Sequence, residues 1–293
     1  MEKKVCAVIV SYNPEENIFN NTKNLIGLVD QVIIVDNGST NEASLNYLSK
    51  LNRLYDNCKI IYNKENKGIA YALNVGCKIA AENDYEWVLT LDDDSSVPEG
   101  MVTNLLKEYY EKKDNKIMIL APIITEFNSE NYMEHSKYVD TVITSGSLIN
   151  IKSFENVGWF KENFFIDMVD IEYCLRLKKH GFKVFQSANA ILYHRLGRQK
   201  NVLSIGKFKW NAYNHNEIRK YYICRNTVQL YKEYFAEFPI KLFLSTKGAF
   251  KIFLLDTLIV EKNKTIKLKM MLKGIKDGFF NRMGKLDEKE ILR

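Results

Sequence analysis

The stretch Val88-Leu89-Thr90-Leu91-Asp92-Asp93-Asp94-Ser95 places residues typical of a buried strand directly before three consecutive carboxylates. Pro98 follows where the first residue of a helix is expected. Residues at the carboxyl ends of parallel strands line the sheet edge where α/β proteins bind ligands. Carboxylates this close repel each other unless a cation lies among them, and an all-oxygen cluster suits Mg²⁺ or Mn²⁺ better than zinc. The stretch therefore predicts either a metal site for a phosphorylated ligand or a solvated acidic turn that caps a helix.

Strand-like and helix-like segments alternate along the chain up to this stretch. The predicted strands are short and apolar, and they cover residues 4–12, 31–35, 59–62 and 87–91. The helices between them have a helical spacing of apolar residues, and they cover residues 16–28, 42–53 and 69–81. This alternation predicts an α/β fold with a doubly wound, mostly parallel, Rossmann-like sheet. Neither GxGxxG nor a P-loop follows the first strand, so a carboxylate-held metal is the available means of neutralising phosphate.

The pattern is less regular after the acidic stretch. The predicted elements are a helix over 98–112, a strand over 116–122, a strand over 141–150 and a pair of short strands over 183–193. Gly146 interrupts the strand over 141–150, which predicts either a β-bulge or a close approach of the backbone to a ligand. The aromatic-rich segment 154–165 predicts a loop that packs against the sheet or stacks on a sugar.

Three acids, Asp167, Asp170 and Glu172, lie at the start of a helix that is predicted to end at Gly181. Carboxylates at this position suit the helix dipole and are explained by capping alone. Asp170 and Glu172 are two residues apart, however, so they face different directions and one of them can point at a neighbouring site. His194 follows the last predicted strand, where a single histidine is either structural or a ligand.

Charge divides the chain into two regions. Residues 1–194 contain 20 Lys and Arg against 27 Asp and Glu, whereas residues 195–293 contain 22 against 9. We predict a ligand-binding domain over residues 1–200 and a basic helical region over residues 201–293. No nucleic-acid-binding motif accompanies the basic region, so its expected partner is an anionic membrane surface or, in a homodimer, a second copy of the chain.

The cysteines and the start of the chain bear on where the protein works. The five cysteines are scattered without a CxxC pair, which indicates neither a disulfide framework nor a cysteine-zinc site. Met1-Glu2-Lys3-Lys4 leads directly into the first strand, so no signal peptide is expected there. Lysines interrupt the apolar runs of the basic region before any reaches the length of a spanning helix. We expect a cytoplasmic protein, peripheral on the inner face of the cell membrane.

A series of motifs then resembles glycosyltransferase family 2, and in particular its bacterial rhamnosyltransferases. The motifs stand in the family's order, and they are VIVSYNP (8–14), VIIVDNGST (32–40), NKGIAYALNVG (66–76), LTLDDDS (89–95), TSGSLI (144–149), FFIDMVDIEYCLRL (164–177) and YHRLG (193–197). The resemblance implies a GT-A fold with a C-terminal helical extension. It also implies an inverting transfer from a nucleoside-diphosphate sugar.

The resemblance assigns the metal and the base to particular residues. Asp92 and Asp94 resemble the outer members of the family's DxD motif, with Asp92 on the ribose side and Asp94 on a Mn²⁺ or Mg²⁺ ion. His194 is similar to the histidine that reaches the metal or the diphosphate. Asp170 matches the catalytic base. Many relatives carry a glutamate directly before the base, where this chain has Val169, so Glu172 is expected to take the supporting role.

Other motif residues are expected to contact the substrate. Asp36 looks like the residue that holds the pyrimidine ring, and Ser11 and Tyr12 look like part of the loop around the nucleoside. The remaining predicted substrate-binding residues come from the other motifs, and they are Asn66, Gly68, Asp93, Gly146 and Glu172. Asp93 departs from the related rhamnosyltransferases, which often have a neutral residue there, and it either alters metal preference or faces water.

The expected activity is the metal-dependent, inverting transfer of rhamnose from dTDP-rhamnose to a hydroxyl group of a lipid-linked bacterial surface glycan. Such a reaction needs the charge that develops on a departing diphosphate to be neutralised and a proton to be taken from the acceptor. UDP-galactofuranose, UDP-glucose and UDP-galactose stay alternative donors. A non-catalytic sugar-nucleotide or glycan-binding module is the alternative of another class, and the complete set of acids with His194 disfavours it. Only the basic region supports a nucleic-acid-binding protein.

Overall fold

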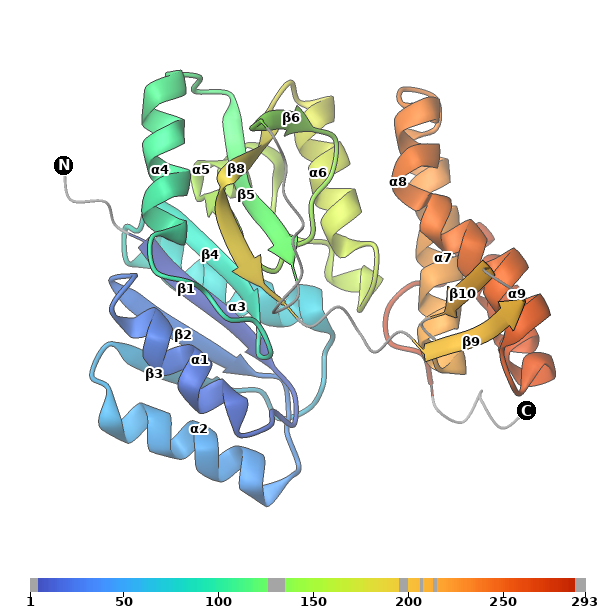
Figure 1. The fold of residues 1–293 in the computed structure, drawn as a ribbon, viewed down its shortest axis with the longest axis horizontal. Coiled ribbons are helices and arrows are strands. Elements are labelled where there is room, and N and C mark those ends of the chain that lie inside the picture. The colour runs from blue at the N-terminus through green and yellow to red at the C-terminus, as the bar shows by residue number, and fades with distance from the viewer. Residues whose placement is uncertain (1–4, 126–134, 195–199, 206–207, 213–214, 288–293) are drawn as a thin grey trace. The chain divides into compact units, whose positions relative to one another are not determined.

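The computed structural model describes residues 5–125, 135–194, 200–205, 208–212 and 215–287 (Figure 1). The chain forms two compact units, Met1–Phe160 with Tyr173–Arg195 and Lys161–Glu172 with Leu196–Arg293. One junction lies close to the boundary predicted at residue 200. The segment Lys161–Glu172, by contrast, groups with the C-terminal unit, which neither charge nor periodicity indicated. We describe each unit separately.

The N-terminal unit is built on an eight-stranded mixed sheet with the order β3-β2-β1-β4-β7-β5-β8-β6 (Figure 1). Its strands are β1 (Val5–Ser11), β2 (Gln31–Asp36), β3 (Cys58–Tyr62), β4 (Trp87–Asp92), β5 (Ile117–Thr125), β6 (Lys137–Val139), β7 (Ser147–Asn150) and β8 (Lys183–Tyr193). The four strands from β3 to β4 are parallel, as is the pair β5 and β8. β7 runs antiparallel between β4 and β5, and β6 is an antiparallel edge strand. The predicted α/β class is confirmed.

Helices cover both faces of this sheet (Figure 1). They are α1 (Asn17–Ile26), α2 (Glu42–Leu54), α3 (Ile69–Glu82) and α4 (Met101–Lys112). The alternation of side chains along β1 explains the layers, because Ala7 and Ile9 join the core beneath α1, α2 and α4, whereas Val8 faces α3. Gly76 of α3 allows this close approach, since a Cβ atom there would lie 2.3 Å from Val8 Cγ1.

Several local predictions were wrong. Helix α4 begins at Met101 and not at Pro98, because Gly100 adopts a left-handed φ of +85° immediately before it. The strand predicted over 141–150 is confined to β7. Residues 183–193 form one strand, β8, and not two. The segment 154–165 contains the end of α5 (Lys152–Val157) and a short 3₁₀ helix, η1 (Glu162–Phe164), where a loop was predicted.

The C-terminal unit is mainly helical, as predicted. It contains α7 (Glu217–Tyr234), α8 (Pro239–Lys251), the π-helix η2 (Ile252–Val260) and α9 (Lys264–Phe279). A hairpin of β9 (Lys200–Ile205) and β10 (Phe208–Ala212), which was not predicted, precedes them. Helices α7 and α9 pack with their backbones close together, because Gly274 has no side chain where a Cβ atom would lie 2.4 Å from Tyr221 O.

Among the described residues, no helix is both long enough and apolar enough to cross a bilayer.

Candidate active site

The carboxyl ends of three neighbouring strands carry the polar residues that the sequence singled out. The parallel register pairs Ser11 of β1 with Asp36 of β2, and it pairs Val10 of β1 with Asp92 of β4. Ser11, Asp36 and Asp92 therefore end adjacent strands at one edge of the sheet. This is the edge where open α/β sheets bind their ligands.

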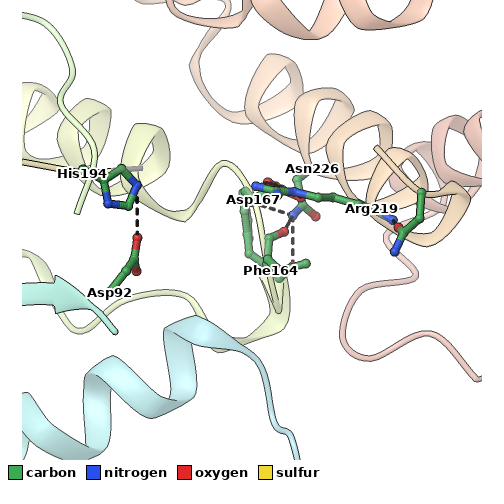
Figure 2. Close-up of polar contacts among 8 residues, drawn as sticks. Asp92, Phe164, Asp167, His194, Arg219 and Asn226 are labelled. Atoms are coloured by element: carbon green, nitrogen blue, oxygen red, sulfur yellow. Dashed lines mark hydrogen bonds and ion pairs between the residues drawn. The ribbon is translucent and has the colours of Figure 1, made fainter. Parts of the chain in front are cut away.

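Asp92, Asp94 and His194 converge just beyond this edge. Figure 2 shows the side chains of Asp92 and His194 pointing toward each other. One ligand atom from each lies within 4.8 Å of the others. His194 Nδ1 is 3.3 Å from Asp94 Oδ1, and His194 Nε2 is 4.0 Å from Asp92 Oδ2. The histidine reaches the acids because Ser96, after β4, exchanges two backbone hydrogen bonds with Tyr193 at the end of β8. The structure thus brings together the three predicted metal ligands.

The donor set fits a divalent cation. Asp94 Oδ1 is buried and accepts no hydrogen bond from any described residue, an arrangement that is costly unless something else neutralises the charge. Two carboxylates and an imidazole are ligands that Mn²⁺ and Mg²⁺ accept. Both acid side chains remain 36% exposed, so an ion and a ligand have access to them.

Asp93 faces away from this cluster and contacts the loop after β1. Its Oδ2 accepts a hydrogen bond of 3.3 Å from the backbone N–H of Tyr12. Burial, together with the charges of Asp94 and Asp92, raises the pKa of Asp93 to about 7. Asp93 therefore connects the acidic stretch to the predicted nucleoside loop, in which the Tyr12 side chain is half exposed.

The predicted nucleoside residues Ser11 and Asp36 lie next to the loop after β2. The Asp36 carboxylate is buried and accepts hydrogen bonds from both the backbone N–H and the hydroxyl of Ser39. Ser11 Oγ is buried and has no hydrogen-bond partner among the described residues. Tyr62, which pairs with Asp36 in the sheet, presents a half-exposed ring that the sequence interpretation missed.

Asn66 and Gly68 shape this loop from the inside. Asn66 Oδ1 accepts hydrogen bonds from Asn37 Nδ2 at 3.1 Å and from the backbone N–H of Gly68 at 3.0 Å. Gly68 has a φ of +90°, which an L side chain rarely adopts. Their predicted contact with substrate stays a prediction, and the contacts observed are structural.

Packing within the protein explains why residue 146 is a glycine. Its φ is +83°, and a Cβ atom there would lie 2.7 Å from Leu192 Cδ2 and 3.1 Å from Pro122 Cγ. The groups that approach Gly146 are thus side chains of this protein. Its predicted role in substrate binding is not needed to explain the glycine.

Asp170 and Glu172 lie in the C-terminal unit, at the start of α6 (Val169–Lys179). Asp170 Oδ1 accepts a hydrogen bond of 2.8 Å from the N–H of Ile171. Burial, together with the nearby charge of Asp167, raises the pKa of Asp170 to about 6. The Glu172 carboxylate is fully buried, 2.7 Å from Tyr234 Oη and 3.1 Å from Lys161 Nζ. Its position favours an internal supporting role over direct substrate contact.

Comparison with known proteins agrees with this geometry. The sequence profile of glycosyl transferase family 2 matches residues 6–174, which is more than half of the chain. The chain belongs to glycosyl transferase family 2. It is 28% identical to the dTDP-rhamnosyl transferase RfbF of Shigella flexneri, over 95% of this chain and 96% of the relative. It is 26% identical to the low-salt glycan biosynthesis hexosyltransferase Agl10 of Haloferax volcanii, over 61% of this chain and 63% of that protein.

Solved structures share the fold of this family 2 chain. GalNAc-T7, solved with UDP, GalNAc and Mn²⁺, superposes with a TM-score of 0.62 at 13% identity, covering 94% of this chain and 56% of that one. Residues 1–349 of TarS from S. aureus, solved with UDP-GlcNAc, superpose with a TM-score of 0.60 at 16% identity, covering 94% and 81%. The predicted family and GT-A fold are confirmed, as is the coarser activity, glycosyl transfer from a sugar nucleotide.

Two serines of this family 2 site were missed by the sequence interpretation. Ser145 Oγ accepts a hydrogen bond from the backbone N–H of Asp92 at 3.0 Å, and it lies 2.7 Å from Ser95 Oγ. Ser95 Oγ in turn lies 2.9 Å from His194 Nδ1. Both serines belong to quoted motifs, so their position beside an acid and a glycine was the available signal. They orient two of the three candidate metal ligands. The end of the YHRLG motif, residues 195–197, lies outside the described residues.

Proposed function

We propose that this family 2 enzyme transfers rhamnose from dTDP-rhamnose to a hydroxyl group of a lipid-linked glycan, with inversion at the anomeric carbon and with Mn²⁺ or Mg²⁺ bound. The observation that carries the metal is the buried Asp94 Oδ1, which accepts no hydrogen bond from any described residue and lies beside His194 and Asp92. The similarity to RfbF over almost the full length of both chains supports rhamnose and its dTDP carrier.

The metal-site residues and Asp170 are proposed to have different roles in the reaction. Asp92, Asp94 and His194 would hold the metal ion, which when bound neutralises the negative charge that develops on the leaving diphosphate. Asp170 accepts the proton of the acceptor hydroxyl as the new bond forms between the acceptor oxygen and the anomeric carbon. The bond from that carbon to the diphosphate breaks on the opposite face, and dTDP leaves. A base with a raised pKa of about 6 is still mostly ionised at neutral pH and is a better proton acceptor than an ordinary carboxylate.

Residues at the strand ends are proposed to bind the nucleoside. The unpartnered Ser11 hydroxyl supplies a hydrogen-bonding group, and the half-exposed rings of Tyr12 and Tyr62 supply surfaces on which a pyrimidine can stack. Asp36 holds the turn at Ser39 beside them. A comparison of thymidine nucleotides with uridine nucleotides therefore tests the identity of the donor most directly.

A thermal-shift screen of nucleotide sugars with and without Mn²⁺ tests the proposal. A ligand that binds only the folded protein stabilises it by mass action, so dTDP-rhamnose with Mn²⁺ is expected to give the largest rise in unfolding temperature. Asp94→Ala is the matched control and should abolish the metal-dependent part. A larger rise in unfolding temperature with a UDP-sugar would identify that sugar nucleotide, and not dTDP-rhamnose, as the donor. No response to any nucleotide sugar, with or without metal, would overturn the proposal.

We also infer that the surface of α8 and α9 meets an anionic membrane, where a lipid-linked acceptor resides. Every acid between residues 239 and 280 is buried, namely Asp256, Glu261 and Asp277. Glu261 pairs with Lys220 and Lys267, and Asp277 pairs with Lys273. The exposed charges of this segment are therefore all positive, and they belong to Lys247, Lys251, Lys262, Lys264, Lys269 and Lys276. Each lysine near an anionic surface contributes about 1 kcal/mol of attraction.

Large apolar side chains are exposed among these lysines. They include Ile240, Phe243, Leu244, Leu272 and Phe279, each more than half exposed. Beside them, α7, α8 and α9 enclose an apolar groove of about 660 Å³, lined in part by Phe235, Ala249, Phe250 and Ile275. Exposed aromatic and aliphatic residues among lysines are typical of interfacial surfaces, and we assign the groove to a hydrocarbon chain of a membrane lipid.

Co-sedimentation with vesicles tests the membrane assignment. We expect binding to vesicles that contain an anionic lipid, weaker binding at high salt, and at least a tenfold loss with Lys247→Glu combined with Lys276→Glu. Lys59→Glu with Lys107→Glu, exposed lysines of the N-terminal unit, is the matched control. Ala249→Trp fills the groove and should weaken binding without changing its salt dependence. If the Lys247→Glu, Lys276→Glu variant and the control variant bind vesicles equally well, the surface of α8 and α9 does not bind the membrane. Concentration-dependent dimers that Phe243→Ser abolishes would assign it to a second copy.

A further inference from the structure

The segment 163–168, directly before the proposed base, has an unusual backbone. Phe165, Asp167 and Met168 have φ angles of +64°, +63° and +63°, although none of them is glycine. Phe165 has a ψ of −66°, and the N–H of Ile166 donates to Phe164 O at 2.8 Å. This geometry is a γ-turn with positive φ at its centre, a rare and strained form. Such a backbone persists only where surrounding contacts hold it.

The side chain of Asn226 on α7 supplies the central contacts (Figure 2). Its Nδ2 donates to the carbonyl oxygens of Phe164 at 3.0 Å, Ile166 at 2.8 Å and Asp167 at 2.9 Å. Asn226 has no exposed surface. A single buried amide group thus binds the carbonyls on both sides of the strained turn.

Arg225, the residue before it on α7, completes and orients this contact. Its guanidinium donates to the carbonyl oxygens of Asn163 at 3.2 Å and Phe164 at 2.9 Å. Its Nε donates to Asn226 Oδ1 at 3.0 Å, which directs the amide nitrogen of Asn226 toward the turn. Arg225 is itself buried and lies against the ring of Tyr222, so it has little freedom to move.

Arg219, two turns earlier on α7, binds the side chain of the same segment. Its Nε and Nη2 lie 3.1 and 3.0 Å from Asp167 Oδ1 (Figure 2). Burial raises the pKa of Asp167, and the Arg219 charge opposes this rise. The arginine therefore favours the ionised form of Asp167, and its charge also favours the ionised form of Asp170.

We propose that Arg219, Arg225 and Asn226 form a clamp that positions Asp170 by holding residues 163–168 in their strained conformation. The proposal rests on the proposed function, because it takes Asp170 as the base. The clamp touches neither substrate nor metal in this account, so its members are positioning residues. Left-handed backbone at Asp167 and Met168 sets the direction in which α6 begins, and the clamp fixes that direction through four carbonyls and one carboxylate.

Asn226→Ala in the full-length protein is the direct test, with release of dTDP from dTDP-rhamnose in the presence of Mn²⁺ as the assay. A displaced catalytic group lowers the rate about 100-fold, so we expect kcat to fall between about 10-fold and 100-fold while the donor KM stays within about twofold. Thr246→Ala, which removes a buried side chain bonded to Leu242 O on α8, is the matched control. Equal kcat values for Asn226→Ala and wild type would overturn the proposal.

Two further variants separate positioning from a loss of folded protein. Met168→Gly in the Asn226→Ala background should restore part of kcat, because glycine adopts positive φ without strain. Arg219→Met, at a half-exposed position, should move the acid limb of the kcat profile to higher pH, since Asp170 then faces Asp167 without the compensating cation. A clamp that only stabilises the fold would leave that limb in place, which counts against the proposal. Full activity of Asp170→Asn would instead remove Asp170 as the base, the part of the proposed function on which this proposal rests.

Discussion

The two acidic sites of this protein are built in opposite ways. Asp92 ends β4 in regular backbone, and its neighbours Asp94 and His194 reach it from the ends of the same sheet. Asp170 follows three non-glycine residues with positive φ, and contacts from α7 hold that segment. At the metal site, the regular hydrogen bonding of the sheet places the strand ends, and single serine hydroxyls complete the orientation of Asp92 and His194. A loop that must deliver a base in one direction needs tertiary contacts that keep it there.

The electrostatics of the two sites differ as well. The metal-site acids are partly exposed, and their mutual repulsion is relieved by a cation. Asp170 is also only partly buried, but this burial and the nearby charge of Asp167 raise its pKa to about 6, which makes it a better proton acceptor. An added ion would therefore relieve the repulsion between the acids of the metal site, whereas at Asp170 burial disfavours the charged form of the carboxylate.

The largest expected effect is at the base. Asp170→Asn keeps the shape of the side chain but cannot accept a proton, so kcat for dTDP release should fall by about 10²–10⁴. Donor binding by calorimetry should stay close to wild type. Turnover near the wild-type rate would transfer the role to Asp167 or Glu172 and would remove the contrast between the two sites.

Asp94→Ala is expected to show the opposite pattern. It removes a candidate metal ligand, so Mn²⁺-dependent donor affinity should fall by about 10²-fold or more, a larger loss than that caused by mutating a residue behind a ligand. Calorimetric titration of dTDP-rhamnose at several Mn²⁺ concentrations measures this. Glu111→Gln, which removes an exposed acid elsewhere, is the control. Unchanged metal dependence would mean that the triad of Asp92, Asp94 and His194 is not the site.

Ser95→Ala should give an intermediate effect. Loss of the hydroxyl that lies 2.9 Å from His194 Nδ1 frees the imidazole, and mutations behind a metal ligand weaken metal affinity about 10-fold to 100-fold. Ser153→Ala is a matched control, because it removes a similar buried hydroxyl, bonded to Tyr173 in the same unit. If Ser95→Ala binds Mn²⁺ as tightly as the wild-type protein and the Ser153→Ala control do, Ser95 serves folding alone.

The smallest effect concerns pH. Since the base acts in its ionised form, kcat should rise with pH through about 6 and fall about tenfold per unit below it. The sign for stability is reversed. The folded protein binds this proton more tightly than the unfolded chain, so the contribution of Asp170 to stability decreases as pH rises from its ordinary pKa to about 6. Asp170→Asn should then unfold at an equal or higher temperature at pH 8. A kcat that is flat between pH 5 and 8 would contradict the raised pKa.

The strand ends of the N-terminal unit were predictable because local patterns specify them. β-branched runs and the acids that follow them gave β1, β2 and β4 within a residue or two of their observed bounds, and they placed Asp36 and Asp92 at the sheet edge. The start of α4 was missed because the helix begins at Met101, directly after the left-handed Gly100, and not at Pro98. The hairpin of β9 and β10 was missed although Gly206, which stands between the two strands in the sequence, was an available turn signal.

The alternation of strands and helices, the acids at the strand ends and the family could all be predicted from the sequence. Each of these features depends on a pattern of residues that are close together along the chain. Only the tertiary structure decided that Ser145 and Ser95 orient Asp92 and His194, and that Arg225 and Asn226 hold the segment before Asp170. These contacts join residues roughly fifty to one hundred positions apart, and no local pattern of polarity or periodicity specifies such partners. The positive φ angles at Phe165 and Met168 are likewise visible only in the folded chain, because neither residue type favours that conformation.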